Sequence, residues 1–147
     1  MKVKLLSSDA KVPTRGTDGA IGYDLYAAES VFIPIGSTGK VKTDISLEIP
    51  MGQIGKIEDR SGMAIKGLRT GAGVCDPDFR GNIGVVLHNL NNDGDRDSLL
   101  MQKGYKVSKG DRVAQIIFYK VELPKLEQVE SLSDTVRDQG AFNSTGR

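Results

Sequence analysis

Residues 71–89 read Gly-Ala-Gly-Val-Cys-Asp-Pro-Asp-Phe-Arg-Gly-Asn-Ile-Gly-Val-Val-Leu-His-Asn, and their pattern decides the fold class. Glycines open the stretch, a Cys-Asp-Pro-Asp turn follows, and Ile83, Val85 and Leu87 then alternate with smaller or polar residues. A period of two indicates a strand with one buried face. The stretch therefore predicts a β-hairpin with the carboxylate of Asp76 at its tip. That carboxylate can hold a water molecule beside a flat ligand, or it can simply cap a surface turn.

Similar alternation recurs on both sides of this stretch. It predicts further strands, and residues 58–67 are the one segment before the C-terminus that suits a short helix. Many short strands with turns every roughly eight to twelve residues are typical of an all-β barrel or jelly roll. The strands are expected at residues 2–6, 23–27, 31–35, 41–49, 53–57, 99–107 and 112–121.

Composition narrows the class of protein. The chain has 147 residues, which fits one domain, and a net charge of +1. This balance predicts no stable nucleic acid partner, because proteins that grip a phosphate backbone usually show a basic excess. No apolar run is long enough for a signal peptide or a membrane span, and one cysteine excludes a disulfide framework. We expect an intracellular, cytoplasmic protein, or one in the host cell if its source is viral or phage.

Cys75 directly precedes Asp76, and the chain's one histidine, His88, lies on the following predicted strand. A nucleophilic thiol needs such a base, so a catalytic Cys–His pair is conceivable. A small buried residue is the favoured interpretation of Cys75. Zinc has less support still, because one Cys and one His cannot complete a tetrahedral set without unusual carboxylate help.

Two segments carry groups suited to anions. Arg60, Ser61 and Gly62 open the predicted helix, where free backbone N–H groups and the helix dipole favour a phosphate. The tail places Phe142 before Asn-Ser-Thr-Gly at 143–146, an aromatic residue followed by hydroxyl and amide groups. Residues 60–62 can instead be an ordinary helix cap with a solvated arginine. The tail can instead be a frayed chain end.

Two polar residues interrupt predicted strands. Asp24 falls on the face opposite Tyr23 and Leu25. Gln115 is the polar member of an otherwise apolar strand at residues 112–121, so it needs a partner in the protein or in a ligand.

Taken together, these elements resemble the five motifs of the trimeric dUTPases, the deoxyuridine triphosphate nucleotidohydrolases, in order and over nearly the whole chain. The resemblance implies a single-domain, distorted jelly-roll β-barrel with one short helix at residues 1–132, and a C-terminal arm at 133–147. The matching segments are Ala20-Ile-Gly-Tyr-Asp-Leu-Tyr-Ala-Ala28, Asp59-Arg-Ser-Gly-Met-Ala64, Gly73-Val-Cys-Asp-Pro-Asp-Phe-Arg-Gly81, Gly110-Asp-Arg-Val-Ala-Gln-Ile-Ile117 and Arg137-Asp-Gln-Gly-Ala-Phe-Asn-Ser-Thr-Gly146.

The resemblance also implies a reaction, the hydrolysis of dUTP to dUMP and pyrophosphate. Asp76 matches the aspartate that activates the attacking water. Arg60, Ser61 and Gly62 match the group that holds the phosphates, and Gln115 matches a further phosphate contact. The implied cofactor is Mg²⁺, which keeps several of its own waters when bound to phosphates.

The remaining positions concern the nucleoside, the metal and the arm. The main chain at Gly73 and Val74 matches the segment that reads uracil, and Phe79 stands where the family usually has the tyrosine that packs under deoxyribose. Asp24 matches an acidic residue that meets the magnesium ion through water. The resemblance implies a homotrimer with shared active sites, in which the arm of one subunit closes a site built by the other two. The matching arm residues are Arg137, Phe142, Asn143, Ser144 and Thr145.

Some features depart from the family pattern. Phenylalanine at position 79 keeps the ring but loses the hydroxyl, and Ala141 and Asn143 replace usual glycines beside Phe142. The loop 90–104 is long and could bind a protein partner. Two alternatives follow: a catalytically weak member that acts as a regulatory module through this loop, and the related dCTP deaminases. The deaminases need a glutamate to move protons, whereas this chain carries an aspartate at Asp76.

Overall fold

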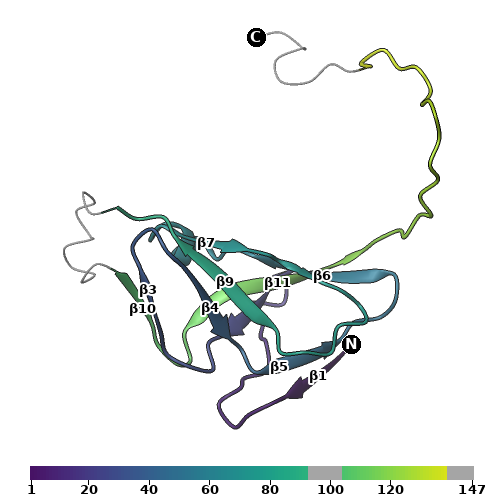
Figure 1. Cartoon of the computed structure of the whole chain (residues 1–147). Coiled ribbons are helices and arrows are strands. Elements are labelled where there is room, and N and C mark those ends of the chain that lie inside the picture. The colour runs from purple at the N-terminus through teal and green to yellow at the C-terminus, as the bar shows by residue number, and fades with distance from the viewer. Residues whose placement is uncertain (93–103, 139–147) are drawn as a thin grey trace.

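The computed structural model describes residues 1–92 and 104–138 (Figure 1). Regular structure there is almost entirely β-strand, with one short helix, so the prediction of an all-β fold is confirmed. In chain order the elements are β1 Lys2–Leu5, β2 Tyr23–Tyr26, β3 Val31–Pro34, β4 Thr38–Lys42, β5 Ile45–Glu48, β6 Gln53–Glu58, α1 Ser61–Ala64, β7 Leu68–Gly71, β8 Val74–Cys75, β9 Gly84–Asn89, β10 Gly104–Val107 and β11 Arg112–Lys120.

Two antiparallel sheets enclose the core. One has the strand order β2-β11-β6-β8 and the other β4-β9-β7, and two further antiparallel pairs are β1-β5 and β10-β3 (Figure 1). Alternate residues of β9 face inward. Val85 and Leu87 of β9 are fully buried in the same apolar cluster as Val113 and Ile116 of β11. The predicted inward face of residues 83–87 is therefore confirmed.

The predicted single strand at residues 41–49 is wrong. The chain forms β4 and β5 there, and these strands lie in different sheets. The break falls at Asp44, whose φ of 51° lies in the left-handed region that few non-glycine residues adopt. Burial alternates across the break, because Val41, Thr43 and Ile45 are all buried. The alternation therefore could not reveal the break.

The predicted hairpin within residues 71–89 is confirmed only at its base, where Gly71 at the end of β7 pairs antiparallel with Val86 of β9. The pairing expected for the residues directly before Asp76 is wrong. β8 pairs with β6, whereas β9 pairs with β4 and β7. Residues 76–83 therefore cross from one sheet to the other, and Asp76 lies at the start of this crossover, directly after β8. Strand alternation fixes which face is buried, but it does not identify the neighbouring strand.

The two ends of the described chain lie outside the core. β1 was expected to be amphipathic, but all four of its residues are exposed, and it pairs only with β5. Beyond β11, residues 122–138 are exposed and form no helix or strand, and Figure 1 shows this segment running away from the barrel. In the described part of the chain, no helix is long and apolar enough to cross a membrane.

Candidate active site

Arg60 lies between the end of β6 and the first residue of α1, and its side chain is held in place by two neighbouring strands. Its Nε donates to Oδ1 of Asp24 on β2 at 2.7 Å. Its Nη1 donates to the carbonyl oxygen of Arg112 on β11 at 3.3 Å. The guanidinium therefore has a fixed position beside Ser61 and Gly62, which are both exposed at the start of α1.

Asp24 is the anchor of this cluster. Its side chain is only 12% exposed, and both carboxylate oxygens are bound, Oδ1 by Arg60 and Oδ2 by Nη1 of Arg112 at 3.2 Å. A carboxylate at this depth requires cationic partners, because its desolvation is otherwise costly. The structure therefore shows Asp24 as the counter-ion of two arginines, and its predicted role toward magnesium stays a prediction.

Asp59 holds the segment before α1 against β7. Its Oδ1 accepts hydrogen bonds from the backbone N–H and the hydroxyl of Thr70, at 2.6 and 2.8 Å, and Oδ2 pairs with Nε of Arg69 at 2.5 Å. Burial opposes the charged form, but the bonds from Thr70 and the charge of Arg69 together lower the pKa of Asp59 below its ordinary value. The carboxylate therefore stays ionised and holds the backbone directly before Arg60 in place against β7.

Gln115 joins the same cluster from β11. Its Nε2 donates to the backbone carbonyl of Asp59 at 2.8 Å. This bond is the partner expected for a polar residue in an otherwise apolar strand. Its Oε1 lies only 2.1 Å from the position that a Cβ atom at Gly22 would occupy. Gly22 thus leaves the room in which the Gln115 amide sits.

A second cluster surrounds the crossover at residues 76–83. A pocket of about 340 Å³ there is lined by Asp76, Phe79, Val74, Lys40 and others, and Asp76 is exposed to it. Gly73 lies just before β8, where its carbonyl accepts a hydrogen bond from the Ile57 N–H at 2.7 Å. The two main chains approach so closely that a Cβ at position 73 would lie 2.5 Å from the Ile57 carbonyl oxygen.

The turn that carries Asp76 and Phe79 is closed by its own backbone and by Arg80. The Phe79 N–H donates to the Asp76 carbonyl at 3.2 Å, and Nη1 of Arg80 donates to the carbonyls of Pro77 and Phe79 at 2.6 and 3.0 Å. The Phe79 ring lies against the backbone of Gly81, where a Cβ would meet its Cζ at 2.5 Å. The exposed ring therefore lies over Gly81, in the space that a side chain at position 81 would fill.

Cys75 and His88 do not form a catalytic pair. Cys75 is buried, and burial together with the charge of Asp76 raises the pKa of its thiol, which disfavours a nucleophilic thiolate. His88 instead shares a 2.8 Å hydrogen bond between its Nδ1 and the Thr38 hydroxyl, and its Nε2 lies over Gly71. The prediction of a small buried cysteine is confirmed.

The predicted site residues thus fall into two groups. Asp24, Arg60 and Gln115 form one cluster with Ser61 and Gly62, and the pocket at the crossover contains none of them. Gly73, Val74, Asp76 and Phe79 belong to the crossover. Arg137 is on the exposed segment after the barrel. The predicted residues Phe142, Asn143, Ser144 and Thr145 lie outside the described residues, as does most of the loop 90–104.

Arg112, Asp59 and Lys40 are among the residues of these clusters that were missed from the sequence. Arg112 and Asp59 stand inside quoted motifs, where a charged residue near Gln115 or beside Arg60 was the available signal. Lys40 lies on β4, far from the crossover in the sequence, and enters the pocket by running across Gly84, where a Cβ would meet its Cε at 2.5 Å. No local pattern could predict that approach.

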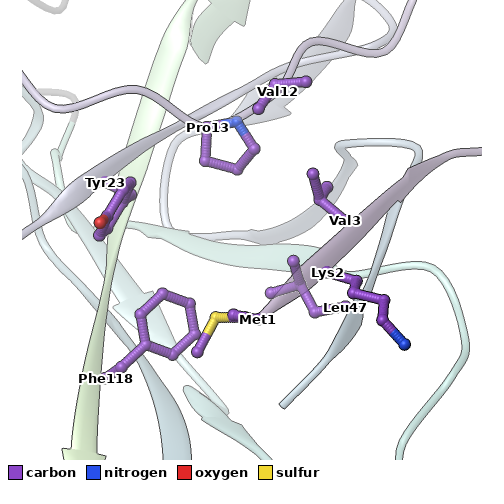
Figure 2. Close-up of a pocket in the computed structure, with 8 residues that line it drawn as sticks. All are labelled: Met1, Lys2, Val3, Val12, Pro13, Tyr23, Leu47 and Phe118. Carbon is purple, nitrogen blue, oxygen red and sulfur yellow. The ribbon is translucent and has the colours of Figure 1, made fainter.

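A second hollow is apolar and contains none of these site residues. It has a volume of about 260 Å³ and lies beside β1, with Met1, Val3, Tyr23 and Phe118 among its walls (Figure 2). Lys2 is the single charged residue among the eight that line it. The hollow therefore suits apolar contacts and not the binding of a nucleotide phosphate.

The all-β barrel carries one cluster of polar residues around Arg60 and, apart from it, the exposed carboxylate of Asp76. This arrangement suits the class of nucleotide hydrolases. Comparison with known proteins identifies the family. The dUTPase family model matches residues 8–146. The deoxyuridine 5'-triphosphate nucleotidohydrolase of Kluyveromyces lactis is 47% identical over 149 aligned positions, which cover 100% of this chain and 94% of that protein. The chain belongs to the dUTPase family.

Solved structures agree in fold. The dUTPase of Staphylococcus bacteriophage 80alpha with dUPNHPP superposes with a TM-score of 0.88 at 30% identity, and the match covers 99% of this chain and 98% of the phage chain. A mutant dUTPase from phage phi11 of Staphylococcus aureus, described with a structural Mg(II) ion, has a TM-score of 0.78 at 27% identity over 90% and 98% of the two chains. These matches confirm the predicted fold class.

Proposed function

We propose that this protein is a dUTP diphosphatase that hydrolyses dUTP to dUMP and pyrophosphate, which limits uracil in DNA and supplies dUMP for thymidylate synthesis. Full-length similarity to named dUTP nucleotidohydrolases supports the activity. The single structural observation that carries the mechanism is the exposed Asp76 carboxylate, fixed beside a pocket by the turn that Arg80 closes. The substrate analogue in the phage 80alpha dUTPase supports dUTP as the ligand.

In this proposal Asp76 is the general base. Its carboxylate accepts a proton from a water molecule, and that water attacks the α-phosphorus in line with the departing pyrophosphate. Arg60 stabilises the negative charge that develops on the phosphate oxygens, with Ser61, Gly62 and Gln115 as further phosphate contacts. The contacts of Arg60 with Asp24 and Arg112 support this role, because a guanidinium that is already oriented loses little freedom on binding.

The described residues fit a magnesium ion that is held mainly by the nucleotide. Residues 1–92 and 104–138 contain no group of three or more His, Cys, Asp or Glu side chains that could form a cage of protein ligands. Asp24 would meet the ion through water, while its carboxylate keeps its bonds to Arg60 and Arg112. When bound, the ion would neutralise charge on the triphosphate.

The pocket at the crossover is the proposed nucleoside site. The main chain at Gly73 and Val74 would read uracil by backbone hydrogen bonds, and the close approach of Gly73 to Ile57 leaves no room for a side chain there. The ring of Phe79 would pack under the deoxyribose and exclude a 2'-hydroxyl group. The place of the ring on the lining of the Asp76 pocket supports this discrimination.

We also propose that the two clusters meet between subunits of a homotrimer. The absence of Arg60, Ser61 and Gln115 from the residues that line the Asp76 pocket supports a site completed by another chain. Exposed apolar side chains support subunit contacts as well, among them Val3 and Leu5 on β1 and Leu126 after the barrel. Residues 1–132 would form the barrel, and the arm 133–147 would bring Arg137 and residues 142–145 to a neighbouring site.

The test is pyrophosphate release with Mg²⁺ from dUTP, dTTP, dCTP and UTP. The proposal expects release from dUTP alone and its loss in Asp76→Asn. Asp78→Asn is the matched control, because it makes the same change on the same exposed turn and should retain activity. A folded wild-type protein that releases pyrophosphate from none of the four nucleotides would exclude the proposed activity.

A further inference from the structure

The crossover that carries Asp76 and Phe79 is hydrogen-bonded, at residues 80–83, to the bend between β4 and β5 and to the start of β5. The Ser46 hydroxyl donates to the Arg80 carbonyl at 2.7 Å, and the Thr43 hydroxyl donates to the Ile83 carbonyl at 2.5 Å. Ser46 and Thr43 are both buried, and the bond from Thr43 is buried with them, which shields it from water. The bend and the start of β5 therefore support residues 80–83.

The centre of this attachment is a reciprocal pair of hydrogen bonds. The backbone N–H of Asp44 donates to Oδ1 of Asn82 at 3.1 Å, and Nδ2 of Asn82 donates to Oδ1 of Asp44 at 2.6 Å. Both residues are half-buried. Asp44 has the left-handed φ of 51°, and an aspartate tolerates this conformation better than most residues. The backbone conformation and the side-chain pair therefore support each other.

Asn82 lies close to the reacting part of the crossover. It lines the same pocket as Asp76 and Phe79, and only Arg80 and Gly81 separate it from Phe79 in the sequence. The turn beyond is closed within itself by the Phe79 N–H and by Arg80. A shift of Asn82 would therefore move the turn as a unit and change where Asp76 and Phe79 point.

We infer that Asp44 and Asn82 are positioning residues for the proposed hydrolysis of dUTP: their paired side chains set the position of the turn that bears the general base and the ring under the sugar. The inference rests on the proposed function. Neither residue needs to touch the substrate. Loss of the pair should lower kcat for dUTP and relax the preference for dUTP over UTP, because Asp76 and Phe79 move together.

The test is a reciprocal exchange of the two side chains. Asn82→Asp places two carboxylates in contact and removes the Nδ2 donor. Combining it with Asp44→Asn restores the pair, because the amide introduced at position 44 can donate to the carboxylate at position 82. The matched control is Asn91→Asp, which lies outside the crossover. It also removes an amide donor, here to the Lys66 carbonyl at 2.9 Å and to Oδ1 of Asn89 at 2.8 Å.

The inference predicts that Asn82→Asp lowers kcat for dUTP by about tenfold or more, as small misplacements of reacting groups do. It also predicts a reduced ratio of kcat/KM for dUTP over UTP, and recovery of both quantities in the double variant. Asn91→Asp should leave the ratio unchanged. An active wild type whose Asn82→Asp variant keeps kcat and the ratio would overturn the inference. So would a double variant that recovers thermal stability but not the ratio. A wild type inactive on dUTP would instead reject the proposed function.

Discussion

At the scale of single residues, the Asp24 carboxylate shows how the phosphate cluster is organised. The sequence predicted that Asp24 lies on the strand face opposite Tyr23 and Leu25, and the resemblance to dUTPases implied a role toward the metal. The structure adds that Arg60 and Arg112 both bind it. These partners lie 36 and 88 positions away in the chain, so no local pattern could have identified them.

Asp24→Asn should weaken the hydrogen bonds that Arg60 and Arg112 donate to this side chain. We expect a loss of about 2 kcal/mol in the free energy of unfolding, since hydrogen bonds to a mostly buried charged group are among the stronger ones. The KM for dUTP should rise because Arg60 is no longer fixed. Asp9→Asn is the control: its pair with Lys109 is half exposed and should contribute little. Urea unfolding and steady-state kinetics measure the two effects, and equal losses in both variants would contradict this role.

Gly22 is predicted to act through Gln115. Gly22→Ala places a methyl group 2.1 Å from the Gln115 Oε1 and should break its bond to the Asp59 carbonyl. We expect the KM for dUTP to rise by roughly fivefold, the equivalent of one lost hydrogen bond. Gly19→Ala is the matched control, because a Cβ there has no atom within 4 Å. A Gly22→Ala enzyme with the kinetics of Gly19→Ala would show that Gln115 does not depend on this space.

Asp59 should give the protein a specific sensitivity to acid. Its pKa is lower in the folded than in the unfolded chain, so its stabilising contribution is present above the unfolded pKa, near 4, and is lost as the pH falls through the folded pKa. Asp59→Asn should therefore reduce the free energy of unfolding at pH 7 by about 1–2 kcal/mol. This deficit should shrink as the pH falls below about 4. Urea unfolding of the wild type and Asp59→Asn at pH 7 and at a pH below about 4 tests this prediction. A deficit in the free energy of unfolding that is the same at both pH values would contradict it.

At the scale of elements, alternation predicted which residues are buried but not how the strands pair. The buried face of β9 was predicted correctly, because a period of two depends only on burial. The alternation of buried residues continues from Val41 through Thr43 to Ile45, so the pattern does not reveal the change of sheet between β4 and β5. β8 and β9 follow each other in sequence and still belong to different sheets. Pairing depends on contacts between distant strands, which the sequence does not display.

The contact between β6 and β8 leads to a prediction at this scale. Gly73→Ala would push its new Cβ against the Ile57 carbonyl oxygen, an atom of the main chain that cannot rotate away. We expect β8 to shift from β6, with lower stability and a sharply raised KM for dUTP. Gly16→Ala, where a Cβ has open space, is the control. Thermal unfolding and kinetics measure the effects; a stable Gly73→Ala protein with normal KM would reject the proposed role of this close approach.

At the scale of the whole molecule, the predicted site residues of the described chain lie in two separate clusters. The sequence predicted Asp24, Arg60 and Gln115 in one and Asp76 and Phe79 in the other, because each motif is local. It could not show that Arg60 and Asp76 lie in different clusters, since that depends on the folded barrel. The proposed homotrimer resolves the separation by joining the cluster of one subunit to the crossover of another.

The most direct measurement is therefore subunit mixing. Asp76→Asn and Arg60→Gln proteins, each inactive alone, are unfolded, mixed in equal amounts, refolded together and assayed for pyrophosphate release from dUTP. If each site takes Asp76 from one chain and Arg60 from its neighbour, random assembly leaves one site in four intact, and activity should return to roughly a quarter of the wild-type value. Mixtures that remain as inactive as the separate variants, although wild type refolds to full activity, would contradict the shared site.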